Sequence, residues 1–290
     1  MWRCTARGRR TARHLNTLMT MTNSPSRPGR TGDRSGSEGV RSRGEIVFPS
    51  DGSVLTPTGR FHQLAGDYGL EFEPEELKQL GRYLALLLAG NAVVNLTAVR
   101  QVEAAWETLI FDALTLIPLL TEVPEGGRVI DVGTGGGLPG LPLAITMPHL
   151  RFTLLDATGK KIAFVRHVIG ELELGNAQAL QGRAEVIGAD RGGGHRDGYD
   201  AVVSRAVART SLLAELTMPL CKIGGVVLMV KGERAQEELD EARQTLHALH
   251  AFHAGTAETP TGRVIVLEKH RATPGKYPRS SAEMKRGPIA

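Results

Sequence analysis

Apolar residues recur at helical spacing in two stretches that precede residue 125. One face of residues 71–91 carries four leucines spaced three and four residues apart: Leu77, Leu80, Leu84 and Leu87. Pro74 stands where a first helical residue would, and two glutamates follow it near the positive end of the helix dipole. The second stretch runs from Val102 to Leu120 with the same spacing. We expect these helices to form a small cap over residues 53–124.

After Gly126 the pattern changes to short apolar runs that alternate with amphipathic stretches. The apolar runs predict strands at 128–132, 151–157, 177–182, 199–204, 224–232 and 262–270. The amphipathic stretches predict crossover helices at 160–174, 208–220 and 233–250. The near-helical spacing of the histidines at 247, 250 and 253 predicts that the last helix extends to His253. Strands that alternate with helices build a mostly parallel sheet covered on both faces, and the last strand would lie at or near its end. The sequence therefore predicts an α/β fold, an open doubly wound sheet, over residues 125–272.

Polar side chains end several of these strands. They are Asp131, Asp156, Ser204 with Arg205, and Lys231. Ligands of doubly wound sheets bind outside the carboxyl ends of the strands, near the point where the strand order reverses. These residues are therefore the first candidates for a binding site.

The loop after the first strand, "GRVIDVGTGGGLPG" at 127–140, fits two cofactor patterns. Counted from Gly135, it matches the dinucleotide fingerprint GxGxxG. Counted from Asp131, it is an acid followed by GxGxG through Gly133, Gly135 and Gly137, which is typical of enzymes that use S-adenosylmethionine. Both cofactors need glycines, because the backbone must approach the ligand closely and turn into a helix.

The acid in front of the glycines favours S-adenosylmethionine. A carboxylate at the position of Asp131 would repel the pyrophosphate of a dinucleotide, whereas it suits a sulfonium and an ammonium group. Asp156, nineteen residues after Gly137, would accept hydrogen bonds from ribose hydroxyls in either class and does not discriminate. A loop without any cofactor, in which Asp131 only caps the turn, remains an alternative.

The positive net charge of the chain comes from its first residues. Residues 1–44 contain ten Arg, no Lys, one Asp and one Glu, a net of +8, so that the other 246 residues carry a net of −4. Residues 1–52 form an Arg-rich extension with few core-forming residues, which we expect to be disordered. An RNA-gripping arm, an organelle presequence and sequence upstream of the true start are its open interpretations.

Composition excludes several classes of protein. No apolar run is long enough to span a membrane, and two cysteines, Cys4 and Cys221, make no disulfide framework. Cys221 is expected to be a buried structural thiol. The histidines at 247, 250 and 253 have no acid or cysteine to complete a metal site. We expect a soluble cytoplasmic protein without a metal.

The chain resembles the ribosomal small-subunit methyltransferase G family, also called glucose-inhibited division protein B. The resemblance rests on "VVNLTAV", "DVGTGGGLPGLPL", "LLDATGKKIAFVRHV", "GRAEV", "VVSRAVA" and "KYPR", which occur in this order over residues from about 60 to 280. It implies a class I (Rossmann-like) methyltransferase fold with an N-terminal helical cap. It also implies methylation of N7 of a guanine in 16S ribosomal RNA, with S-adenosylmethionine as the methyl donor.

The same resemblance implies a set of cofactor contacts. By motif they fall on Gly133 and Leu138 of the glycine loop, on Ala184 and Glu185 of "GRAEV", on Arg205, and on Asp156 as the ribose partner. Two blocks depart from the family pattern. Leu109 stands where relatives carry a histidine, and the C-terminal "YPRRxGxPxKxPL" is reduced to "YPRSSAEMKRGPIA".

The sequence also limits which kind of atom can accept the methyl group. After the fourth strand the chain has "SRAVA" in place of the Pro-Pro-aromatic turn of enzymes that methylate exocyclic amines. No cysteine lies there to attack a pyrimidine carbon. Guanine N7 has a free lone pair and carries no proton, so its methylation needs no general base. An inactive homologue would lack a base as well.

Arg205 is the residue expected to act at the reacting centre, bridging cofactor and RNA or hydrogen-bonding a guanine edge. A salt bridge to Asp156 or Glu185 is the alternative. Lys231, and Lys276 and Arg279 of a basic C-terminal tail at 273–290, are candidates for phosphate contacts with 16S ribosomal RNA or the small ribosomal subunit. We expect a monomer that binds no membrane. A methyltransferase with a protein or small-molecule acceptor, a dehydrogenase and a silent binding module are the rival hypotheses.

Overall fold

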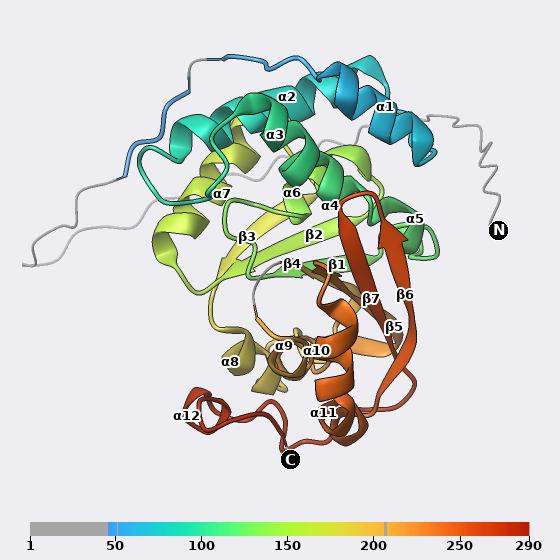
Figure 1. Cartoon of the computed structure of the whole chain (residues 1–290). Helices are drawn as coiled ribbons and strands as arrows, with labels where there is room; N and C mark the ends of the chain where they lie inside the picture. Colours follow the sequence, from blue (N-terminus) through green and yellow to red (C-terminus); the bar gives the residue numbers. More distant parts are fainter. Residues whose placement is uncertain (1–45, 51, 206–207, 290) are drawn as a thin grey trace, which may run out of the picture. The chain divides into compact units, whose positions relative to one another are not determined.

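The computed structural model describes residues 46–50, 52–205 and 208–289 (Figure 1). Its first elements are helical: α1 (Gly59–Asp67), α2 (Pro74–Gly90), α3 (Val102–Ala105), the π-helix η1 (Trp106–Phe111), α4 (Asp112–Leu114) and α5 (Ile117–Leu120). The rest alternates: β1 (Arg128–Val132), α6 (Gly140–Thr146), β2 (Arg151–Asp156), α7 (Gly159–Glu171), β3 (Ala177–Gln181), α8 (Ala184–Ala189), β4 (Tyr199–Arg205), α9 (Thr210–Thr217), β5 (Cys221–Lys231), α10 (Ala235–Glu241), α11 (Arg243–Leu249), β6 (Ala251–Thr259), β7 (Gly262–Lys269) and α12 (Ser281–Met284).

In the described part of the chain the strands form one sheet in the order β3-β2-β1-β4-β5-β7-β6. The first five strands of that order are parallel, and β7 runs antiparallel to both β5 and β6. The order reverses between β1 and β4, so the carboxyl ends of these two strands flank the switch point at which ligands of such sheets bind. The predicted α/β fold class is confirmed.

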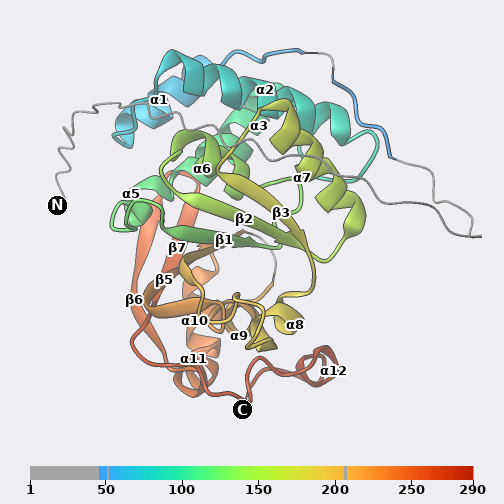
Figure 2. The ribbon, with the colours of Figure 1, turned by 180° about the vertical axis from the view of Figure 1, so that it is seen from behind.

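Helices cover the sheet on both faces (Figures 1 and 2). The cap helices lie over α6 and α7 on one face, and one apolar core joins them to the strands. Helices α8 to α11 lie on the other face, where a second apolar core includes Val202, Val227 and Ile265. The sheet thus holds the strand ends in fixed register while the cap reaches the loops above them.

Two elements differ from the prediction. The stretch 233–250 splits into α10 and α11, and α11 ends at His250 in a left-handed conformation (φ 61°). The next residues form β6, which the helical histidine spacing concealed, and His253 lies in this strand and not on a helix face. The predicted helix from Val102 to Leu120 is broken, with a π-helical turn in its middle. Residues 109–116 are all buried. The helical turns in this stretch are therefore determined by packing on every side, and not by one apolar stripe as in a surface helix.

The ends of the chain also pack in part against the body. Residues 45–290 form one compact unit, and residues 1–45 of the predicted extension lie outside the described residues. The last part of that extension is ordered, because the Phe48 ring is buried with its centroid 5.4 Å from that of Phe164. In the predicted C-terminal tail, Tyr277 and Ile289 are buried and α12 begins with a capping box. None of the described helices has the length and apolar character needed to cross a membrane.

Candidate active site

Asp131 organises the glycine loop from below. It is the penultimate residue of β1 and has no exposed surface. Its Oδ2 accepts hydrogen bonds from Thr134 Oγ1 (2.7 Å) and from the backbone N–H of Gly140 (2.9 Å), so one carboxylate oxygen joins the start of the loop to the start of α6. The predicted acid is therefore the residue that fixes the shape of the loop.

The second oxygen of Asp131 has no partner within the described part of the protein. Oδ1 is buried without a hydrogen-bond partner among the described residues. Burial raises the pKa of Asp131 to about 7, although the hydrogen bonds from Thr134 and Gly140 and the charge of Arg205 lower it. An orphaned carboxylate oxygen in a dry interior favours a cationic partner. The sulfonium and ammonium groups of S-adenosylmethionine have that charge.

The loop is packed on one side and open on the other. Gly137 has φ +98°, and a Cβ there would lie 2.2 Å from the Leu141 side chain, so only glycine fits. Gly135 also has a positive φ (+57°), but a Cβ there would meet nothing closer than the Gly133 carbonyl oxygen at 3.9 Å. The space beside Gly135 is thus free, which is what a cofactor lying against the loop requires.

Asp156 ends β2 beside the same loop. Its Oδ2 accepts the backbone N–H of Gly135 (3.1 Å), and its Oδ1 accepts that of Thr158 (2.8 Å). Each carboxylate oxygen retains a lone pair for a further donor. Asp156 therefore lies at the carboxyl end of β2 beside the glycine loop, and its role as ribose partner stays a prediction.

The other predicted cofactor residues lie around this edge of the sheet with different roles. Leu138 is buried in the core, and its N–H donates to the Thr134 carbonyl (2.9 Å). Ala184 begins α8, after the carboxyl end of β3. The Glu185 carboxylate accepts Arg183 Nε (2.7 Å) and the Ser281 hydroxyl. Burial alone would raise the pKa of Glu185, but these hydrogen bonds outweigh it and lower that pKa.

The helical cap holds the glycine loop from above. Tyr83 on α2 is fully buried and donates its hydroxyl to the carbonyl of Gly136 (3.0 Å). Burial raises the pKa of Tyr83 well above its ordinary value, so the hydroxyl stays a donor. The sequence pattern places Tyr83 on a cap helix but does not predict its contact with Gly136, because the two residues are 53 positions apart and no local pattern links them.

Arg205 ends β4 at the switch point and is held by the cap. Its Nη1 donates to the carbonyl of Thr108 in η1 (2.9 Å) and lies 3.4 Å from Asp112 Oδ2. The alternative expectation, a salt bridge to Asp156 or Glu185, was wrong about the partner, because the carboxylate beside Arg205 is that of Asp112. The neighbouring Ser204 donates its hydroxyl to the Val132 carbonyl (2.7 Å), which ties β4 to β1.

A pocket of about 460 Å³ opens beside Arg205, at the carboxyl ends of β4 and β5. Asp112 lies in its wall, and its Oδ1 accepts the Thr261 hydroxyl (2.6 Å). Asp112 is a site residue that sequence reasoning missed. It belongs to the same block as Leu109, whose position drew attention because the family histidine is absent; Leu109 itself is buried in the core.

The candidates for phosphate contacts are mostly engaged within the protein. Lys231 Nζ lies 2.8 Å from Glu238 Oε2, and its side chain is only 8% exposed. Arg279 forms a forked pair with the buried Glu215, with Nη2–Oε2 at 2.8 Å and Nε–Oε1 at 2.9 Å. Internal carboxylates thus take the place of the phosphates expected for these two residues. Lys276 is exposed, with its Nζ 5.1 Å from the centroid of the Tyr277 ring.

Two further expectations concern cysteine and metal. Cys221 is fully buried, and burial raises the pKa of its thiol to about 12, so it stays a protonated structural thiol. The described residues contain no group of three or more His, Cys, Asp or Glu side chains placed to hold a metal ion.

Comparison with known proteins gives consistent matches. The family model for rRNA small subunit methyltransferase G matches residues 76–264. The ribosomal RNA small subunit methyltransferase G of Sorangium cellulosum is 41% identical over 236 residues, covering 81% of this chain and 97% of the relative. That of Deinococcus radiodurans is 42% identical over 244 residues, covering 78% and 91%. A solved S-adenosylmethionine-dependent O-methyltransferase from Thermotoga maritima is 16% identical, covers 65% of this chain and 72% of its own, and has a TM-score of 0.44.

Proposed function

Because the chain belongs to the rRNA small subunit methyltransferase G family, we propose that it methylates N7 of a guanine in 16S ribosomal RNA. S-adenosylmethionine is its cofactor and supplies, when bound, an electrophilic methyl group on a sulfonium. The observation that carries the proposal is the position of Arg205. It stands at the switch point, between the glycine loop with its orphaned Asp131 oxygen and the pocket lined by Asp112.

The residues of the glycine loop and those of the pocket beside Arg205 have separate roles. Asp131, the open face at Gly135 and Asp156 would hold the cationic end and the ribose of the cofactor. The pocket beside Arg205 would take the guanine. Methyl transfer from a sulfonium is an in-line displacement, so alignment of donor and acceptor is the main demand on the protein.

The chemistry of the pocket suits an acceptor that has no proton to remove. The Asp112 carboxylate is occupied by Arg205 and Thr261 and is not a free base. Guanine presents O6 and N7 as neighbouring acceptors on one edge. A donor of Arg205 on O6 would fix the ring while the N7 lone pair stays free to attack.

The test is methyl transfer from labelled S-adenosylmethionine to small ribosomal subunits that lack the modification. We expect the wild type to form 7-methylguanine in 16S RNA, and Arg205→Ala to lose at least 90% of the rate while keeping its affinity for the cofactor. Arg209→Ala is the matched control, because Arg209 pairs with Glu241 on the surface. Cofactor binding without label in RNA would overturn the acceptor and leave a protein or small-molecule acceptor as the alternative.

The setting of this activity follows from its substrate. The proposed partner is 16S ribosomal RNA or the small ribosomal subunit, which places the enzyme in the cytoplasm, and we propose that it acts as a monomer. Lys276 is the predicted phosphate contact that remains exposed for this substrate.

A further inference from the structure

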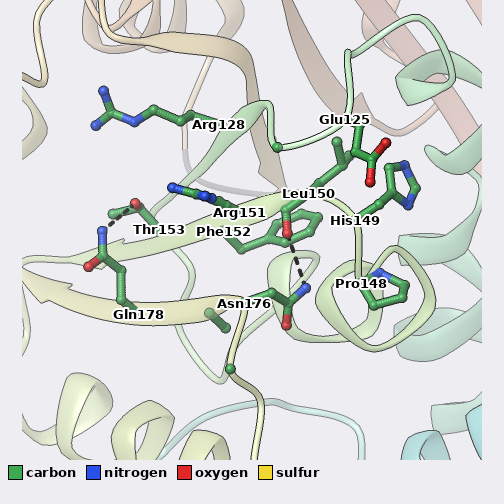
Figure 3. A pocket seen from close by; sticks show the side chains of 13 residues that line it. Glu125, Arg128, Pro148, His149, Leu150, Arg151, Phe152, Thr153, Asn176 and Gln178 are labelled. Atoms are coloured by element: carbon green, nitrogen blue, oxygen red, sulfur yellow. Dashed lines mark hydrogen bonds between the residues drawn. The ribbon is translucent and has the colours of Figure 1, made fainter. Parts of the chain in front are cut away.

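A second hollow, of about 780 Å³, lies at the amino ends of the strands, on the side of the sheet opposite to the glycine loop (Figure 3). It is formed at the amino ends of β1 and β2 and by the segments that lead into β2 and β3. The five residues of β1 separate it from the glycine loop by roughly 16 Å at about 3.3 Å per strand residue. The cofactor and the pocket beside Arg205 therefore do not account for it.

Two arginines stand side by side in this hollow. Arg128 and Arg151 are the first residues of β1 and β2, and their Cα atoms are partners in the parallel ladder. Figure 3 shows both side chains extending in the same direction. Like charges on directly opposed residues of neighbouring strands destabilise a sheet, because the two charges repel each other. A pair of this kind needs a function or a counter-charge.

The described residues provide no carboxylate for either guanidinium. Arg128 donates to the carbonyl of Gly194 (3.3 Å) and lies 4.6 Å from the centroid of the Tyr199 ring. Arg151 is exposed and makes no side-chain hydrogen bond or ion pair with the described chain. The lining includes one carboxylate, that of Glu125, which lies with His149 at the far end of the hollow from the guanidinium groups in Figure 3.

Polar groups line the hollow beside the two arginines. Burial is the main cause that lowers the pKa of the neighbouring His195, and the positive charge of Arg128 is the second cause. Gln178 Nε2 donates to Thr153 Oγ1 (3.0 Å) on the floor of the hollow, which leaves its second N–H free for another acceptor. Planar guanidinium groups match the oxygens of a phosphate with paired hydrogen bonds.

We propose that this hollow binds a phosphate group between Arg128 and Arg151, and that the phosphate is a diester of the RNA substrate. The second half of this statement rests on the proposed function. Because the hollow lies at the edge of the sheet away from the glycine loop, the phosphate belongs to a different RNA segment from the one that presents the guanine. The contact fixes the orientation of the enzyme on its substrate and carries no sequence information.

The experiment compares Arg151→Ala with Arg166→Ala in the full-length protein. Arg151 has no side-chain partner among the described residues, so its removal leaves the fold intact. Arg166 is an exposed arginine on α7 that makes no side-chain hydrogen bond or ion pair with the described residues. Affinity for small ribosomal subunits that lack the modification is measured over a series of salt concentrations. Binding of inorganic phosphate is followed separately by phosphorus NMR.

We expect Arg151→Ala to weaken subunit binding about tenfold and to reduce the slope of log K against log salt by about one, whereas Arg166→Ala changes neither. If Arg151→Ala loses inorganic phosphate but keeps its affinity for subunits, the hollow is a phosphate site whose ligand is a free phosphate. Equal behaviour of the two variants in both assays overturns the proposal. Failure of methylation by the wild type would overturn the proposed function and, with it, the RNA diester as the ligand, whereas the phosphate titration would still decide whether the hollow binds phosphate.

Discussion

Asp131 combines a structural and a ligand-binding task in one carboxylate. One oxygen shapes the glycine loop through Thr134 and Gly140, and the other is buried without a partner. Because burial raises its pKa to about 7, the residue changes its protonation state in the neutral pH range. The approach of a cation would favour the ionised form and release the proton.

This linkage predicts a pH dependence of cofactor binding. We expect the affinity for S-adenosylmethionine to increase as the pH rises from about 6 to 8, since the proton no longer has to leave above the pKa of Asp131. Asp131→Asn should bind the cofactor more weakly and lose this dependence. Calorimetric titration at several pH values in buffers of different ionisation enthalpy measures both the affinity and the proton release. The same pH profile in the wild type and in Asp131→Asn would contradict the assignment.

The residues of the site differ in how far sequence predicts them. Asp131, Asp156 and Arg205 lie at the carboxyl ends of strands with clear apolar patterns, so topology alone brings them to one side of the sheet. Tyr83 and Asp112 are joined to the site across 53 and 93 residues by packing of the cap. No local pattern encodes such contacts. For the same reason the alternative expectation of a salt bridge from Arg205 did not include Asp112.

Among the elements, the cap is part of the active site. Helix α2 supplies Tyr83 to the glycine loop, and η1 and α4 supply the Thr108 carbonyl and Asp112 to Arg205. Both halves of the site therefore depend on how the cap packs on the sheet.

Tyr83→Phe tests the contact between α2 and the loop. The substitution removes one hydroxyl and leaves the Gly136 carbonyl without its buried donor, which should lower the free energy of unfolding by about 1–2 kcal/mol. We also expect several-fold weaker cofactor binding, because the loop loses an anchor. Chemical denaturation and calorimetry measure the two effects. Tyr68→Phe is a suitable control, since Tyr68 donates to the Thr115 carbonyl within the cap itself and should leave cofactor affinity unchanged.

Asp112→Asn tests whether α4 positions Arg205. The change keeps the shape of the side chain and removes its charge, so the ion pair is lost and Arg205 is held less firmly, by the Thr108 carbonyl and a neutral amide oxygen. We expect kcat for methyl transfer to fall about tenfold, which corresponds to about 1.4 kcal/mol, while cofactor affinity stays within twofold.

A double-variant cycle separates positioning by Asp112 from an independent role. If Asp112 acts through Arg205, then Asp112→Asn should add nothing to the loss caused by Arg205→Ala. Additive losses would show that Asp112 contacts the substrate on its own.

At the level of elements, the parallel strands were predicted closely and the later part was not. Strands β1, β2, β4 and β5 are largely buried apolar runs whose composition leaves little choice of structure, whereas β3 is short and only partly buried. Strand β6 carries the mixed sequence "AFHAGTAET", exposes Phe252 and contains an irregularity between His253 and Gly255. Its pairing with β7 stabilises it as a strand, and its own composition does not.

On the scale of the whole molecule, the C-terminal segment is fastened to the body through Arg279. The forked pair with Glu215 joins this segment to α9, and Glu215 is only 1% exposed on its side chain. Tyr277 is buried beside it. The reduced family motif "YPRSSAEMKRGPIA" thus keeps the arginine that serves the fold.

Arg279→Ala should therefore act on stability. It leaves the Glu215 carboxylate buried without its cation, and we expect a loss of about 2–3 kcal/mol, below the cost for a fully buried pair because Arg279 is partly exposed. The added substitution Glu215→Gln should restore part of that loss. Thermal unfolding measures both. If Arg279→Ala instead has unchanged stability and binds RNA more weakly, Arg279 contacts an RNA phosphate, as expected from the sequence.

The bonds from the cap to the loop and to Arg205 have a consequence for recombination and engineering. A chimera that takes residues 53–124 from a distant relative keeps every residue of the glycine loop, yet it replaces the donor at Tyr83 and the acid at Asp112. Such a crossover exchanges catalytic parts while leaving the recognisable motif untouched. The cap and the sheet therefore act as one unit, and a productive breakpoint lies before the cap and not at its junction with β1.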